Sequence, residues 1–155
     1  MSERSRIFPA EEYRGRVKAL QAGLTEAGID ALLLTTPPDV FYVTGFLTRF
    51  WESPARPWFV VVPAARDPVA VIPAIGADLM RRTWVDDIRT WDAPDPADDG
   101  VSLLAVALAS LVPVTGRAAL PIGLETHLGM PLADYSRGLS RLAPPAAVDA
   151  TTTFR

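Results

Sequence analysis

The segment Ile29 to Thr35, with the sequence IDALLLT, constrains the fold more than any other part of this chain. Its apolar residues follow one another without alternation, which is typical of a strand that other elements cover on both faces. Gly28 stands directly before the segment, where it can end a helix, and Pro37-Pro38 follows and forces a turn. A helix, a doubly covered strand and a turn in this order predict an α/β fold.

Patterns before and after this strand predict further helices and strands in alternation. From Glu11 to Ala27 apolar residues recur at steps of three and four, which is typical of an amphipathic helix. Asp39 to Gly45 is expected to form one or two turns of helix, with Asp39 as its cap and Gly45 as its end. Strands are expected at Trp58 to Val62, Val69 to Ile72, Asp87 to Trp91, Ile122 to Glu125 and near Ala147 to Ala150. Helices are expected at Gly76 to Thr83, Asp98 to Leu111 and Pro131 to Leu142.

The strands Trp58 to Val62 and Val69 to Ile72 are joined by the linker PAARDP. Because this linker is too short for a crossover, the two strands must form an antiparallel hairpin, and the sheet is therefore expected to be mixed. A chain of 155 residues fits one domain. We predict a single α/β domain over residues 1–155, in which helices flank a mixed central β-sheet.

Composition narrows the class of protein and its partners. Hydrophobic residues make up 49% of the chain and charged residues 21%, which is typical of a soluble globular protein rather than a disordered one. The net charge is −3 and the arginines are scattered, so we expect no nucleic acid partner. The longest apolar run, Val101 to Val112, is too short to span a bilayer of about 30 Å, and no membrane contact is expected. The absence of cysteine excludes disulfides and predicts a cytoplasmic location.

Most residue signatures of hydrolytic and redox chemistry are missing. The chain has no glycine-rich dinucleotide or phosphate loop and no Gly-x-Ser-x-Gly elbow. One imidazole, that of His127, cannot build a histidine-rich metal site, so we expect a partly exposed histidine that contacts a nearby carbonyl or carboxylate such as Glu125. The acidic stretch Asp86 to Gly100 offers oxygen ligands suited to calcium or magnesium, but its spacing matches no known cation loop and favours a solvated loop.

The segment Thr44 to Trp58 is the best candidate for ligand contact. It combines two arginines, a carboxylate and several aromatic residues between a helix end and a central strand. Arginine binds planar anions in a bidentate way, and aromatic rings supply a flat wall at low entropic cost. The alternative is an ordinary long loop in which Phe46, Trp51 and Trp58 fill the core or an interface.

The stretch Gly28 to Phe46, GIDALLLTTPPDVFYVTGF, resembles the opening of the N-terminal domain in the creatinase, prolidase and aminopeptidase P family. Weaker similarities follow in the same order, at the hairpin strands, at Ile122 to Glu125 and at Val148 to Ala150. The resemblance implies a small α/β domain with a mixed sheet of about six strands. In that family a separate C-terminal pita-bread domain is catalytic. It holds two divalent metal ions such as manganese, cobalt or zinc, although creatinase uses the same fold without metal.

No part of this chain matches that catalytic domain, so the resemblance implies an excised or truncated N-terminal domain without catalytic residues or a cofactor of its own. Its partner would be the C-terminal catalytic domain of the parent protein, in a homodimer. There it would cap the active site of a metal-dependent Xaa-Pro dipeptidase, aminopeptidase P or creatinase-like amidinohydrolase.

The same resemblance places substrate contacts in the loop before the second central strand. Arg56 matches the arginine that holds a substrate carboxylate across the dimer in creatinase, and we expect its neighbours in this loop to contribute, namely Arg49, Trp51, Glu52 and Trp58. The alternative function is that of a free-standing α/β module that binds a small carboxylate ligand with the same loop.

Overall fold

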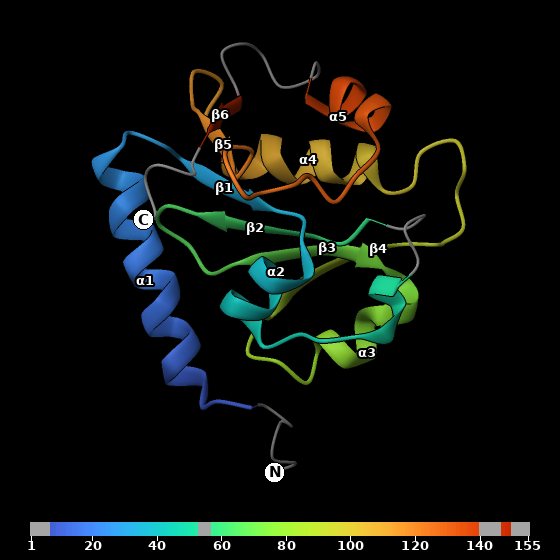
Figure 1. Ribbon diagram of the computed structural model, residues 1–155, viewed down its shortest axis with the longest axis horizontal. Helices are drawn as coiled ribbons and strands as arrows, with labels where there is room; N and C mark the ends of the chain where they lie inside the picture. The colour runs from blue at the N-terminus through green and yellow to red at the C-terminus, as the bar shows by residue number, and fades with distance from the viewer. Residues whose placement is uncertain (1–6, 53–56, 140–146, 150–155) are drawn as a thin grey trace.

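The computed structural model describes residues 7–52, 57–139 and 147–149. Its centre is a β-sheet with helices on both faces (Figure 1). The strands run in the order β4-β3-β2-β1-β5-β6. The first five of these form the body of the sheet, and β6, a strand of three residues, lies beyond β5. The expected α/β class, a mixed sheet flanked by helices, is confirmed.

The helices and strands alternate along the chain. In chain order they are α1 (Ala10–Glu26), β1 (Ala31–Leu34), α2 (Pro37–Thr44), the 3-10 helix η1 (Arg49–Glu52), β2 (Phe59–Pro63), β3 (Val69–Pro73), the 3-10 helix η2 (Ala74–Gly76), α3 (Ala77–Met80), β4 (Asp87–Trp91), α4 (Val101–Leu111), β5 (Ala118–Leu120), α5 (Leu132–Leu139) and β6 (Ala147–Asp149). Within the described part of the chain, no helix is long and apolar enough to cross a membrane.

The pairing of the strands brings several chain segments to one edge of the sheet. β2 is antiparallel to both β1 and β3, which confirms the expected hairpin. β1 pairs with β5 in parallel, β3 pairs with β4 in parallel, and β5 pairs with β6 in parallel. The carboxyl ends of β1, β3, β4 and β5 therefore lie at the same edge as the amino end of β2. The loops that leave these strands meet there.

The two faces of the sheet carry separate hydrophobic cores. Leu32 and Leu34 of β1 belong to the core beneath α1 and α2, whereas Ala31 and Leu33 belong to the core beneath α4. Figure 1 shows α1, α2 and α3 on one side of the sheet and α4 and α5 on the other. Helices therefore cover both faces of β1, as the unbroken run of apolar residues predicted.

The start of α2 differs from the expectation. Asp39 is not the cap, because the helix already begins at Pro37 and its N-cap is Thr36. The Thr36 hydroxyl oxygen accepts a hydrogen bond from the Asp39 backbone N–H at 3.4 Å. Prolines are tolerated in the first turn because N–H groups there have no partner within the helix. Gly45 ends the helix in the left-handed region with φ 75°, as expected.

The prediction of a strand at Ile122 to Glu125 is wrong. The strand that pairs with β1 is Ala118–Leu120, and the residues after it form a loop and turn. Pro121 has no N–H with which to continue the ladder, and the side chain of Leu124 is 74% exposed. The start of β5 is fixed instead by Asp30, whose carboxylate accepts a hydrogen bond from the Arg117 backbone N–H at 2.8 Å.

Two expected helices are shorter than predicted. The helix expected at Gly76 to Thr83 is the 3-10 helix η2 followed by one turn, α3, that ends at Met80. The helix expected from Asp98 begins only at Val101, because Asp99 and Gly100 have positive φ values of 49° and 82° that a right-handed helix excludes. The Asp98 carboxylate instead accepts hydrogen bonds from the backbone N–H and the hydroxyl of Ser102 at 2.6–3.2 Å. Residues 140–142 of the last expected helix, and Ala150 of the last strand, lie outside the described residues.

Candidate functional site

The chain leaves α2 at Gly45 and passes through η1 before it enters β2, at the edge of the sheet where several loops meet. Figure 1 shows η1 beside α3 at this edge. The candidate segment therefore lies on a rigid support, because α2, β2 and α3 all pack into the core beneath it. Loops held by such a support are where proteins commonly place binding residues.

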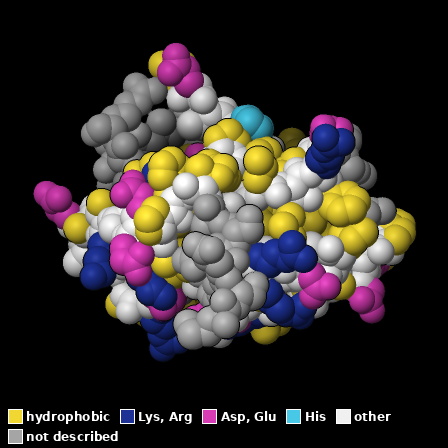
Figure 2. Space-filling view, turned by 90° about the horizontal axis from the view of Figure 1, so that it is seen from below, with side chains coloured by type: hydrophobic (Ala, Val, Ile, Leu, Met, Phe, Trp, Pro, Cys, Tyr) yellow, Lys and Arg dark blue, Asp and Glu magenta, His cyan; other side chains and the backbone are white. Residues whose placement is uncertain are grey.

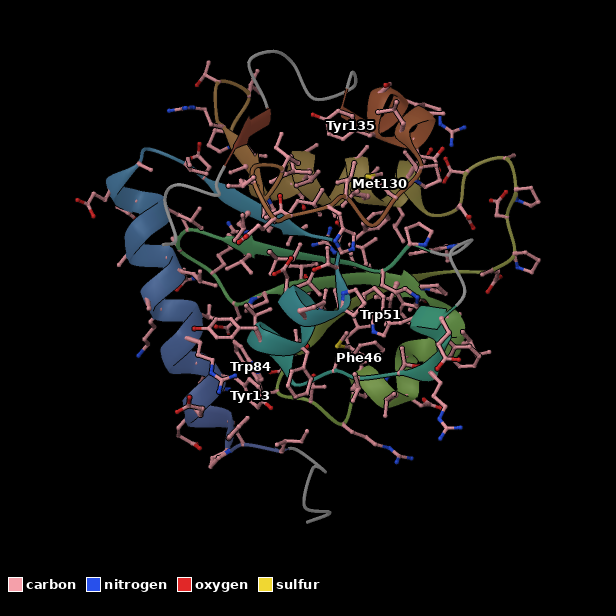
Figure 3. The ribbon with its side chains drawn as sticks, viewed as in Figure 1. Tyr13, Phe46, Trp51, Trp84, Met130 and Tyr135 are labelled. Atoms are coloured by element: carbon pink, nitrogen blue, oxygen red, sulfur yellow. The ribbon has the colours of Figure 1, made fainter. Side chains whose placement is uncertain are left out.

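Four aromatic residues form the centre of this region, which we call the Trp58 cluster: Phe46, Phe50, Trp51 and Trp58. The ring centroid of Trp58 lies 5.5 Å from that of Phe46, 5.7 Å from that of Trp51 and 6.5 Å from that of Phe50. These separations are typical of favourable aromatic pairs. Figure 3 shows Phe46 and Trp51 lying close together near α3. The cluster ties η1 to Trp58, the residue that directly precedes β2.

The structure separates the predicted site residues into exposed and buried groups. Arg49 and Glu52 lie on η1 with exposed side chains, Trp51 is half-buried, and Trp58 is buried. Arg56, the foremost candidate, lies outside the described residues. Phe46 and Trp58 are thus placed as the core interpretation expected, whereas Arg49 and Glu52 are free to meet a ligand. Substrate contact by any of the five stays a prediction.

This region holds several hydrogen-bond donors. The indole N–H groups of Trp51 and Trp58 are buried and have no acceptor among the described residues. Arg49 has no ion-pair partner in the same part of the chain. An exposed guanidinium beside an apolar aromatic surface suits a ligand that carries a carboxylate and a hydrophobic side chain.

One part of this surface was not anticipated from the sequence. An ideal Cβ on Gly76 would lie 2.3 Å from Cζ3 of Trp58, so the start of α3 packs directly on the indole ring. Ile75 and Leu79 are exposed beside it, as are Leu47 and Phe50 on the η1 side. We call these four residues the apolar patch. Figure 2 shows hydrophobic side chains gathered at the right of the molecule, the side on which η1 and α3 lie in Figure 1.

Other candidate sites from the sequence take structural roles or stay untested. The Asp95 carboxylate accepts hydrogen bonds from the backbone N–H groups of Ala97 and Asp98, which fits the solvated-loop interpretation of the acidic stretch. Among the described residues, no group of three His, Cys, Asp or Glu side chains could hold a metal ion. His127 is exposed, and its expected contact with Glu125 stays a prediction.

A guanidinium with a perturbed pKa lies away from this region, on β4. The hydrogen bond from Arg89 to the Asp87 carboxylate, at 3.0 Å, raises the pKa of Arg89. Arg89 also donates to the Ser110 hydroxyl at 3.2 Å, so it joins β4 to α4. Because an arginine is protonated at every physiological pH, this pair is structural and does not titrate there.

Comparisons with known proteins identify the family. The model of the creatinase/prolidase N-terminal domain matches residues 16–155. No protein with a curated function matches the sequence at a significant level.

Solved structures share the fold. The dipeptidase PepE from Mycobacterium ulcerans is 25% identical with a TM-score of 0.70, over 97% of this chain and 37% of that one. A proline dipeptidase structure from Streptococcus pneumoniae is 17% identical with a TM-score of 0.69, over 88% of this chain and 92% of that one. The creatinase/prolidase N-terminal domain of an X-Pro dipeptidase from Streptococcus pyogenes is 13% identical with a TM-score of 0.66, over 86% of this chain and 92% of that one.

This chain spans about a third of the Mycobacterium ulcerans dipeptidase but nearly all of the two streptococcal structures. The family model covers almost its whole length, including the Gly28 to Phe46 stretch in which the resemblance was first visible. The chain belongs to the creatinase/prolidase N-terminal domain family.

Proposed function

We propose that this chain is the non-catalytic N-terminal domain of a Xaa-Pro dipeptidase or creatinase-type hydrolase, in which it caps the active site and supports dimerisation. The observation that carries the proposal is the family match over residues 16–155, together with the coverage of about a third of a dipeptidase. Catalysis in the parent enzyme then belongs to a C-terminal domain, which in a Xaa-Pro dipeptidase would hold two divalent metal ions such as manganese, cobalt or zinc.

The geometry at the η1 edge supports a capping role. Arg49 and Glu52 are exposed on a short helix that the Trp58 cluster fixes in place. A cap over a dipeptide site needs a cation for the substrate carboxylate and an apolar wall for its side chains. Arg49 and Arg56 supply the cation in this proposal, while Phe50 and Trp51 supply the wall.

The apolar patch supports the dimerisation role. Phe50 and Ile75 are 42% and 56% exposed. The Phe50 ring stacks on Trp58, and Ile75 precedes Gly76, which packs on the same indole. The surrounding surface carries charges of both signs, among them the ion pair of Arg81 with Asp78. An apolar centre with a charged rim is the usual anatomy of a protein interface.

Enzyme assays of two polypeptides test the proposal. We expect the 155-residue chain alone to leave Xaa-Pro dipeptides and creatine intact with manganese, cobalt or zinc, because under this proposal it caps an active site and does not itself catalyse. The longer parent polypeptide is expected to hydrolyse one of these substrate classes. Turnover by the purified 155-residue chain that a chelator abolishes would contradict a non-catalytic role.

The exposed Arg49 guanidinium also favours a second candidate, a free-standing module that binds small carboxylates. A thermal-shift screen of amino acids, dipeptides and guanidino compounds separates the two functions. Saturable stabilisation of the isolated chain, lost in Arg49→Gln, favours the module, because a complete site stabilises the folded state by mass action. A cap that forms only half of a site is expected to show no such stabilisation.

A further inference from the structure

Arg16, in the middle of α1, lies at the centre of three aromatic rings. Its guanidinium carbon is 4.8 Å from the ring centroid of Phe8, 5.2 Å from that of Tyr13 and 4.9 Å from that of Tyr42. It also forms an ion pair with Glu12 at 3.0 Å. The Arg16 side chain is only 17% exposed, so these contacts are largely shielded from water.

Arg16 also completes the carboxyl end of α2. Its Nη1 donates a hydrogen bond at 3.2 Å to the carbonyl oxygen of Tyr42, which is 26 residues further along the chain. The last carbonyl groups of a helix have no partner within the helix, and their dipoles favour a cation nearby. α2 has no basic residue in its own last turn. α1 therefore supplies the cation that α2 lacks.

A continuous set of contacts leads from Arg16 to η1. The ring of Tyr13, on which Arg16 stacks, lies so close to Gly45 that a Cβ there would be 2.7 Å from the phenol oxygen. Gly45 is the left-handed residue that turns the chain out of α2. The next residue, Phe46, packs on Trp58, and Trp58 in turn contacts Trp51 and Phe50 of η1.

We propose that Arg16 is a positioning residue, which fixes the end of α2 and thereby the direction in which the chain carries Arg49 and Glu52. A planar guanidinium is suited to this task, because it stacks on several rings while it donates in the plane, whereas a lysine ammonium cannot do both. The effect of Arg16 on η1 stands independently of any enzyme activity. Its effect on catalysis rests on the proposed function.

The test uses the indole N–H resonances of the four tryptophans in the 15N-labelled chain, assigned by single Trp→Phe variants. Arg16→Met keeps an apolar stem but removes the charge and the donors. We expect it to shift the resonances of Trp51 and Trp58 by more than a linewidth, while Trp91, in the core on the other face of the sheet, stays in place. Arg16→Lys is expected to shift the same two resonances less.

The matched control is Arg14→Met, on the same helix. Arg14 stacks on Trp84 at 5.1 Å and has no such contact with Tyr42 or Tyr13 among the described residues. We expect this variant to shift Trp84 and leave Trp51 and Trp58 unchanged. Trp84 also donates to the Val43 carbonyl of α2 at 2.9 Å, so it responds to both variants and is not the diagnostic signal.

A folded Arg16→Met chain with unshifted Trp51 and Trp58 resonances would overturn the positioning role, even if its melting temperature falls. If Arg16→Met does not fold, Arg16→Lys decides in the same way. In the longer parent enzyme, Arg16→Met is expected to raise KM for a dipeptide about threefold or more while kcat changes less than about twofold. A wild-type parent without hydrolase activity refutes the proposed function alone, since the resonance shifts do not depend on it.

Discussion

Gly76 is the position at which the packing of the candidate site can be tested most sharply. Its φ is −91°, an ordinary value, so alanine there meets no backbone strain. The added Cβ would lie 2.3 Å from Cζ3 and 2.7 Å from Cη2 of Trp58. Trp58 cannot move aside freely, because it is buried and packs against Phe46 and Trp51. We therefore expect Gly76→Ala to overpack the Trp58 cluster.

Overpacking of this kind costs about 1–3 kcal/mol in the free energy of unfolding. For a domain of this size, that loss lowers the melting temperature by roughly 2–12 °C. Gly15→Ala is the matched control, because nothing lies within 4 Å of the added Cβ in the middle of α1. There alanine is expected to stabilise the chain by about 0.5–1 kcal/mol, so the two glycine substitutions should act in opposite directions.

Urea unfolding followed by circular dichroism measures both changes. A double-mutant cycle with Trp58→Phe adds a second test, because phenylalanine lacks the benzo-ring atoms that the new Cβ would meet. Gly76→Ala is expected to cost less in the Trp58→Phe background than in the wild type. A Gly76→Ala chain as stable as the wild type, or strictly additive effects, would refute the packing described at this edge.

Three further predictions follow from the same region. Thr36→Ala removes the cap of α2 and is expected to lower the free energy of unfolding by about 1 kcal/mol in urea unfolding, whereas Thr36→Ser is expected to change it little. Gly45→Ala forces a left-handed alanine against Tyr13 and is expected to lower the melting temperature more than Thr36→Ala does. If the proposed parent enzyme dimerises through the apolar patch, the pair Leu47→Ser with Phe50→Ser is expected to weaken that dimer in sedimentation without unfolding the chain. Val106→Ser, at an exposed residue of α4, is the control.

The body of the fold could be predicted from the sequence where a local signal fixed it. β1 was visible as an unbroken apolar run, because α1 and α4 cover its two faces. Gly45 was visible as a helix end, because glycine tolerates the left-handed region that such an end needs. The strand at β5 was missed because Ile122 to Glu125 is the more patterned stretch, although Pro121 separates it from the ladder.

The candidate site could be predicted only in part. The Thr44 to Trp58 segment was identified by its arginines and aromatic residues, which are close together in the sequence. Two other contacts join residues that are far apart in the chain: Gly76 packs on Trp58, and Arg16 contacts Tyr42. No local sequence pattern signals such contacts. Tertiary packing, rather than propensity, placed these residues at the site.

The mass and activity of the native gene product test the central claim most directly. If this chain is the cap of a hydrolase, the product purified from its source organism is expected to weigh more than twice the 16.7 kDa of these residues. The same gel-filtration peak is expected to hydrolyse either Xaa-Pro dipeptides, in a chelator-sensitive way, or a creatine-like guanidino compound. A native product of 16.7 kDa without a catalytic domain would contradict the account.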